Sequence, residues 1–111
     1  MNCLFCDIVN RKIKTPLVYE DEWLVGFEDI HPQAPIHCLI IARKHINDLN
    51  KLTDPALAGQ LMIAATTLAK KFNLSKDGYR IVMNCNQQGG QTIYHIHMHL
   101  LGGRQMNWPP G

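Results

Sequence analysis

The stretch Tyr94-His95-Ile96-His97-Met98-His99-Leu100-Leu101 alternates histidines with large apolar residues near the end of the 111-residue chain. Alternate side chains of a β-strand project to the same face, so this pattern predicts a strand with its three histidines together. Tyr94 and the apolar residues between the histidines are expected to point into the core. Half of the six histidines in the chain fall within this one stretch. A row of imidazoles is costly as core filling, which indicates a chemical role.

Working outward, we expect four more short strands and two helices. The predicted strands cover residues 17–20, 23–28, 37–42, 79–84 and 94–101. The main helix is predicted to begin at Pro55, because Asp54 is a favourable N-cap and apolar residues recur from Leu57 to Phe72 at spacings of four and three. A shorter helix is expected within residues 3–9. Strands joined by short turns predict an antiparallel sheet, so the fold class is α+β.

The composition excludes several classes of protein. A length of 111 residues suits one domain, and 46% hydrophobic residues suffice for a core. The net charge of +2 is too small, and the basic residues too scattered, to indicate a nucleic acid or a membrane surface as partner. The apolar runs are too short to span a bilayer and the N-terminus lacks the features of a secretory signal. We therefore expect a soluble cytoplasmic protein.

A row of histidines serves two kinds of chemistry. Histidines on a strand can share a zinc ion, or one imidazole can attack phosphorus while its neighbours bind charge. Residues 88–92, Gln-Gly-Gly-Gln-Thr, come just before the histidines and form a loop of small and polar residues. Backbone N–H groups of such a loop can approach a phosphate closely. The loop therefore favours attack at phosphorus.

The run His95-Ile96-His97-Met98-His99-Leu100-Leu101 resembles the signature of the histidine triad (HIT) superfamily. Residues 29–37 resemble its nucleotide-binding segment, and residues 89–92 resemble its phosphate loop. The tail of residues 102–111 is similar to the C-terminus of the Hint branch, the purine nucleoside phosphoramidases. This resemblance implies a single HIT domain over residues 1–111, with sheets joined across a homodimer. Residues 102–111 would then be a tail that contacts the partner subunit.

The resemblance gives the catalytic residues unequal roles. His97 would be the nucleophile that forms a transient nucleotidyl-histidine, which water then hydrolyses. The backbone carbonyl of His95 would hold the other ring nitrogen of His97. His99 would contact the phosphate, and His37 would support the group from the adjacent strand. Thr92 stands where Hint enzymes usually have serine, so we expect altered tolerance for the leaving group rather than lost chemistry.

The resemblance also implies a nucleotide site. Asp29 would bind the ribose hydroxyls, and Asn84 would make a second polar contact near the ribose and phosphate. Trp108 would contact the leaving group in the partner subunit, or would anchor the tail through its apolar ring. The base is expected in an apolar slot of Phe5, Ile8, Ile13, Phe27 and Ile30, and the phosphate beside residues 88–92, named here the glycine loop. The implied set is Phe5, Ile8, Ile13, Phe27, Asp29, Ile30, Asn84, Gly90, Gln91, Thr92, His97, His99 and Trp108.

Cys3 and Cys6 have the C-x₂-C spacing of half a common zinc site. By resemblance to bacterial HIT proteins that carry this pair, His45 and His95 would complete a tetrahedral structural zinc site. A closed site with four protein ligands has no open position for an activated water. The resemblance therefore implies no catalytic cofactor.

The main prediction is hydrolysis of the P–N bond in adenosine or guanosine 5′-phosphoramidates, which gives AMP or GMP and an amine. Two alternatives stay open. One is hydrolysis of dinucleoside polyphosphates by the same triad, against which the tail and the Gly89-Gly90 loop argue. The other is a non-catalytic, nucleotide-binding regulatory protein.

Overall fold

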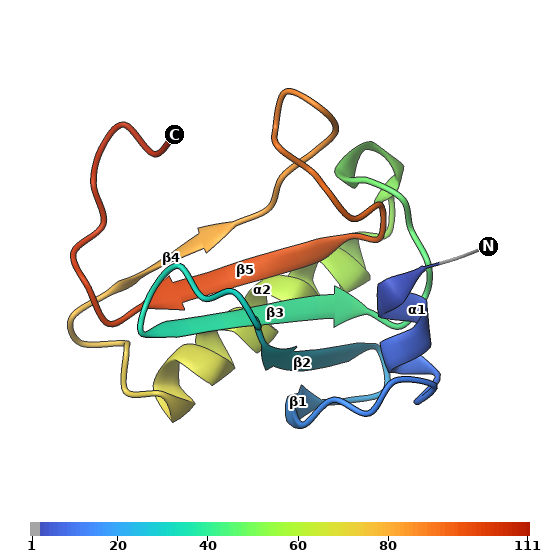
Figure 1. The fold of residues 1–111 in the computed structure, drawn as a ribbon, viewed down its shortest axis with the longest axis horizontal. Coiled ribbons are helices and arrows are strands. Elements are labelled where there is room, and N and C mark those ends of the chain that lie inside the picture. Colours follow the sequence, from blue (N-terminus) through green and yellow to red (C-terminus); the bar gives the residue numbers. More distant parts are fainter. Residues whose placement is uncertain (1–2) are drawn as a thin grey trace.

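A computed structural model describes residues 3–111 as a five-stranded sheet with a helix against each face (Figure 1). The strands are β1 (Leu17–Glu20), β2 (Leu24–Glu28), β3 (Ile36–Ala42), β4 (Tyr79–Val82) and β5 (His97–Gly102). The helices are α1 (Leu4–Val9), α2 (Pro55–Lys71) and the short 3₁₀ helix η1 (Leu49–Lys51). Neighbouring strands are antiparallel in the order β1-β2-β3-β5-β4. The predicted α+β fold, with a main helix and a short N-terminal helix, is confirmed.

Helix α2 covers one face of the sheet and begins where the sequence predicts. Asp54 caps it by accepting a hydrogen bond from the N–H of Ala56 at 2.9 Å, and Pro55 occupies the first turn. Its buried side chains are Leu57, Leu61, Ala64, Ala65, Leu68 and Ala69. They pack against side chains that include Ile40, Ile96, Met98 and Leu100. No helix within residues 3–111 is long and apolar enough to cross a membrane.

Helix α1 packs on the opposite face, near the end of the sheet where β5 begins (Figure 1). Its buried residues Phe5 and Ile8 join a second core cluster with Val25, Phe27, Leu39 and Ile41. In the β3–β5 ladder, His97 lies opposite Ile41 and His99 lies opposite Leu39. Directly opposed residues of an antiparallel pair share a face. The two strand histidines therefore face the α1 side of the sheet, away from α2.

Two local predictions at the histidine stretch are wrong. Strand β5 begins at His97 rather than at Tyr94, and Tyr94 is 43% exposed instead of pointing into the core. The chain leaves the strand path because the N–H of Ile96 donates to the carbonyl of Ile46 at 2.7 Å. This hydrogen bond ties the segment before β5 to the loop after β3. The other four strands start and end within two residues of their predicted positions.

Candidate functional site

A cleft of about 800 Å³ opens beside α1. Its apolar wall contains every residue predicted for the base slot, and its polar wall contains histidines and a carboxylate. The apolar wall includes Phe5, Ile8, Ile13, Phe27 and Ile30, and the polar wall includes Asp29, His31, Gln33, His37, Thr92 and His99. Clefts of this volume suit small ligands such as nucleotides. Eight of the predicted nucleotide contacts therefore line one cavity.

His97 is held in one protonation form beside this cleft. Its ring is 8% exposed, and its Nδ1 lies 2.8 Å from the carbonyl oxygen of His95. A carbonyl only accepts, so Nδ1 carries the proton and Nε2 keeps its lone pair. Phe5 packs edge-on against the ring with 5.1 Å between centroids. Burial lowers the pKa of His97, against the opposing effects of the His95 carbonyl and Asp29, so the ring is neutral at pH 7.

His99 is held in the opposite tautomer through His37. The backbone N–H of Gln33 donates to Nδ1 of His37 at 3.0 Å, so neutral His37 carries its proton on Nε2. That nitrogen lies 2.9 Å from Nδ1 of His99, which therefore accepts. The proton of neutral His99 is then on Nε2. Burial, followed by the neighbouring His97 and His37, lowers the pKa of His99 to about 4.

Three potential metal ligands beside the cleft lie within 4.8 Å of one another. They belong to Asp29, His37 and His99, named here the acid–histidine site. The Asp29 carboxylate is 3.4 Å from Nε2 of His37. The hydrogen bond from Gln33, however, occupies the one ring lone pair of neutral His37. A metal ion on Nε2 would force His37 to lose that bond. The acid–histidine site therefore suits a hydrogen-bond relay better than metal ligation.

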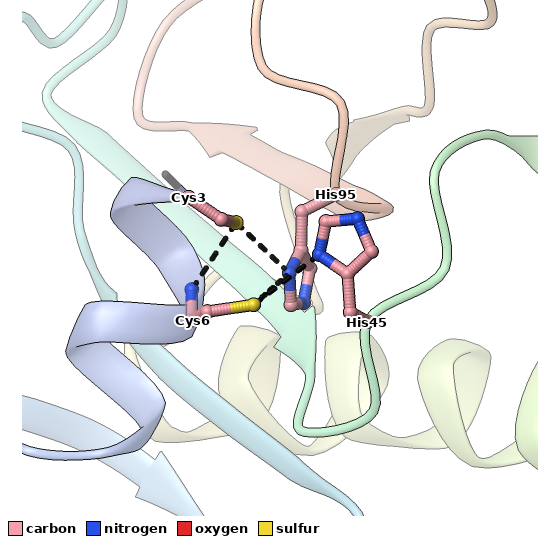
Figure 2. A group of neighbouring side chains, drawn as sticks. All are labelled: Cys3, Cys6, His45 and His95. Carbon is pink, nitrogen blue, oxygen red and sulfur yellow. Dashed lines mark hydrogen bonds between the residues drawn. The ribbon is translucent and has the colours of Figure 1, made fainter. Parts of the chain in front are cut away.

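A second group of potential metal ligands lies at the N-terminal end of the histidine stretch (Figure 2). It consists of Cys3, Cys6, His45 and His95 and is named here the Cys₂His₂ site. Nδ1 of His95 is 3.4 Å from Sγ of Cys3 and 3.5 Å from Sγ of Cys6. Nδ1 of His45 is 3.2 Å from Sγ of Cys6. A tetrahedral zinc ion, with bonds of about 2.3 Å to sulfur and about 2.0 Å to nitrogen, holds such ligands about 3.5 Å apart. The predicted metal ligands thus come together at a spacing that fits zinc.

The outer nitrogens of these two histidines are already bonded, which fixes their tautomers. Nε2 of His95 donates to the carbonyl of Ala42, and Nε2 of His45 donates to Oδ1 of Asn47 at 2.7 Å. Each ring therefore directs the lone pair of Nδ1 toward the sulfur atoms (Figure 2). Burial, followed by the neighbouring Cys3, raises the pKa of the Cys6 thiol to about 11. A bound cation would favour the thiolate.

Gln91 lies inside the protein rather than on the wall of the cleft. Its side chain is 7% exposed and donates to the carbonyls of Asn47 at 2.8 Å and Ile93 at 3.1 Å. Its Oε1 accepts from the N–H of Asn86 at 2.8 Å. The side chain therefore ties the glycine loop to the strand connection that carries His45. Gly90 has a φ of +81°, a conformation that glycine adopts without strain.

The remaining predicted residues, including His97 and Gly90, lie outside the cleft lining. The ring of His97 contacts Phe5, which lines the cleft. Asn84 lines a smaller cavity of about 230 Å³, which shares His37 and His99 with the cleft. Trp108 is 82% exposed in the tail. The triad histidine His95 is fully buried and contacts the Cys₂His₂ site instead of the cleft. The row of histidines thus divides between two sites.

Two residues that position the site were missed. Asn47 orients His45, and its only sequence signal is a polar side chain two residues after that histidine. Gln33 orients His37 through its backbone N–H, and no side-chain pattern could reveal such a contact. Asn47 binds the ring nitrogen of His45 that faces away from Cys6, and Gln33 binds the ring nitrogen of His37 that faces away from His99.

The chain matches one family of known proteins. The family model described as HIT domain matches residues 10–106. A Zea mays protein named 14 kDa zinc-binding protein is 46% identical to it, over 97% of this chain and 87% of that protein. A HIT family hydrolase from Legionella pneumophila has a crystal structure with a TM-score of 0.96 and 52% identity, covering 99% of this chain and 100% of that one. A histidine triad nucleotide-binding protein from Candida albicans, at 27% identity, has a TM-score of 0.85 over 97% of this chain and 83% of its own.

Proposed function

This chain belongs to the HIT domain family, and we propose that it is a purine nucleoside phosphoramidase. It would hydrolyse the P–N bond of adenosine or guanosine 5′-phosphoramidates to AMP or GMP and an amine. The observation that carries this proposal is the state of His97. Its ring is neutral, its Nδ1 is held by a backbone carbonyl, its Nε2 keeps the lone pair, and the ring packs against Phe5, which lines the cleft of about 800 Å³.

The cleft supports a nucleotide in one orientation. The purine base would lie against Phe5, Phe27 and Ile8, which form its apolar wall. Oδ1 of Asp29 accepts from the N–H of His31 at 2.8 Å, which fixes the carboxylate. Its remaining lone pairs would accept the ribose hydroxyls. This orientation directs the 5′-phosphate toward the histidines.

The reaction would proceed in two displacements. Nε2 of His97 attacks phosphorus, the P–N bond breaks, and its electron pair leaves with the amine nitrogen, which takes up a proton. Water then attacks phosphorus, the bond to His97 breaks, and one proton of the water returns to the solvent. The carbonyl of His95 stabilises the positive charge that the His97 ring gains when it is nucleotidylated. The Nε2–H of His99 would donate to a phosphoryl oxygen as its charge develops.

We also propose a homodimer in which the tail of one chain reaches the site of the other. Strand β4 forms one edge of the sheet, and an edge strand presents unpaired backbone groups that a second copy can extend. Trp108 is 82% exposed in the tail, and tryptophan is enriched at protein interfaces, which supports a contact beyond this chain. In such a dimer the β4 edges would join the two sheets side by side, and Trp108 would contact the partner subunit.

The Cys₂His₂ site would hold one structural zinc ion. Its ligand spacing and its bonded outer nitrogens support this assignment, as does the name of the Zea mays relative. The zinc would fix α1 to the segment before β5 and so support the wall on which His97 rests. A set of four protein ligands provides no open position for water.

Turnover of an AMP–amine conjugate by the wild type and by His97→Ala tests the function. We expect the rate to fall at least about a thousandfold, because the covalent step loses its nucleophile. Mass spectrometry of quenched wild-type reactions should detect a nucleotidyl adduct on His97. Melting temperature and zinc content of the variant should match the wild type, which excludes misfolding as the cause. A His97→Ala variant with the wild-type rate would overturn the mechanism, and preferred cleavage of a dinucleoside polyphosphate would favour the alternative hydrolase.

A further inference from the structure

The smaller cavity of about 230 Å³, named here the arginine cavity, is lined by Arg80 and Arg104 together with His37, His99 and Asn84. We propose that it binds the leaving group and selects amines that carry an anionic group, namely a carboxylate such as that of an amino acid. This inference rests on the proposed phosphoramidase function and specifies its substrate class.

The arginine cavity lies on the side of His99 away from the nucleophile. Leu101 lines the arginine cavity and not the larger cleft, His99 lines both, and His97 lines neither. Along β5 the side chains of His97, His99 and Leu101 share one face, about 6.5–7 Å apart in succession. In an in-line displacement at phosphorus the leaving group departs opposite the attacking atom. A phosphate attacked by His97 and contacted by His99 would therefore direct its leaving group toward this cavity.

Strand register places Arg80 on the same face. Arg80 lies opposite Leu101 and Val82 lies opposite His99 in the β4–β5 ladder. Opposed residues share a face, so Arg80 projects on the side that carries His99. Arg104 follows β5, and its Nε donates to the carbonyl of Gln33 at 3.0 Å. The two guanidinium groups thus reach the cavity from a strand and from the tail.

Both guanidinium groups keep an uncompensated charge. Arg80 donates to the carbonyl of Asn107 at 2.9 Å, and Arg104 donates only to backbone carbonyls. Within residues 3–111 neither arginine forms an ion pair, whereas Arg43 lies 3.0 Å from Glu20. Asp77 lines an adjoining cavity with both arginines and pairs with neither. A guanidinium has five N–H donors, so donors and charge remain for an anion.

The size of the arginine cavity argues for a small leaving group. Its volume is about 230 Å³, against about 800 Å³ for the cleft in which we place the nucleotide. An amine the size of an amino acid fits this space better than a second nucleoside does. Guanidinium groups also bind phosphate, so the test must separate a carboxylate from a phosphorus-based anion.

The test compares AMP joined through a P–N bond to β-alanine with AMP joined to β-alanine amide. The two conjugates differ in charge but little in size. We expect the wild type to prefer the carboxylate by about tenfold in kcat/KM, as for a partly exposed charge-assisted contact. Arg80→Gln and Arg104→Gln should each reduce this ratio toward one. Lys70→Gln, which removes an exposed charge from α2 on the other face of the sheet, should keep the wild-type ratio.

Two further arms separate the possible outcomes. Arg104→Lys keeps the charge but loses the fork that binds the carbonyls of Gln33 and Gln105, so it should retain more of the preference than Arg104→Gln. An equal rate for both conjugates in the wild type, or a ratio that neither arginine variant changes, would overturn the inference and leave the proposed function intact. Faster turnover of a 2-aminoethylphosphonate conjugate than of the β-alanine conjugate would overturn the carboxylate assignment. If the wild type cleaves no P–N conjugate, the proposed function itself fails.

Discussion

The Cys₂His₂ site and the acid–histidine site both gather metal-binding groups within 4.8 Å, yet they are built for different tasks. In the first, the outer nitrogens of His45 and His95 are bonded and the lone pairs of Nδ1 face the sulfur atoms. In the second, a backbone N–H occupies the lone pair of His37 and leaves a proton between His37 and His99. Proximity alone therefore does not define a metal site. The hydrogen-bond partner on the far side of each ring determines whether a lone pair is available to a metal ion.

His95 connects the Cys₂His₂ site to the proposed nucleophile His97. The side chain of His95 belongs to the Cys₂His₂ site, while its carbonyl holds Nδ1 of His97. A second connection runs from His45 through Asn47 to Gln91 and the glycine loop. The structural site is thus joined to the proposed catalytic site at the nucleophile and at the phosphate loop. Because only the Cys₂His₂ site is built to bind zinc, removing its ligands should release the metal, whereas removing residues of the acid–histidine site should not.

The largest expected effect is the loss of zinc. Wild-type protein purified without a His tag should contain one zinc per chain, and Cys6→Ser should contain none, because a tetrahedral site loses one of its four ligands. The unfolding free energy should fall by about 4 kcal/mol, the stabilisation given by a ligand at about a thousand times its Kd. Elemental analysis and denaturant unfolding measure the two quantities. His37→Asn, at the acid–histidine site, should keep one zinc per chain; equal zinc loss in both variants would contradict the comparison.

The sequence predicts the elements whose signals are local. Asp54 and Pro55 fix the start of α2 through contacts within one turn, and β1 spans the predicted residues 17–20. The segment before β5 was predicted wrongly because its path depends on distant partners. The ring of His95 bonds to the carbonyl of Ala42, 53 residues away. Such a contact removes His95 from the strand, and no alternation of residue types encodes it.

The candidate site likewise contains residues that the sequence identifies and residues that depend on distant contacts. The base-slot residues and the four metal ligands follow from motifs and from resemblance to a family, and the structure brings each group together. Asn47 and the backbone of Gln33 could not be identified, because their role depends on which ring nitrogen they meet. Arg80 reaches the site only through the register of β4 against β5. Strand pairing of that kind has no local signature.

An intermediate effect is expected at the connection between the sites. Gln91→Ala would leave the N–H of Asn86 and the carbonyl of Asn47 without partners, at a cost of about 1–3 kcal/mol. We expect faster hydrogen exchange in residues 86–92 and about tenfold lower kcat/KM, with zinc retained. Gln88→Ala provides the matched control, because its side chain is exposed in the same loop. If both variants behaved alike, Gln91 would not be a tether between the two sites.

The smallest expected effect is the contribution of His99, in the acid–histidine site, to the pH dependence of stability. Burial lowers the pKa of His99 from its ordinary 6.5 to about 4, so the unfolded chain binds this proton more readily than the folded one. The contribution of neutral His99 to the unfolding free energy is fully present above pH 6.5. It is lost as the pH falls from 6.5 toward 4, because the unfolded chain takes up the proton first. His99→Asn should therefore lose less unfolding free energy than the wild type between pH 7 and pH 4.5, by about 1 kcal/mol after discounting for partial exposure. Denaturant unfolding at both pH values measures the difference. Acid release of zinc should affect both proteins equally. The control variant His31→Asn, at an exposed histidine, should follow the wild type. An identical pH slope for His99→Asn and the wild type would show that His99 is not held neutral by its surroundings.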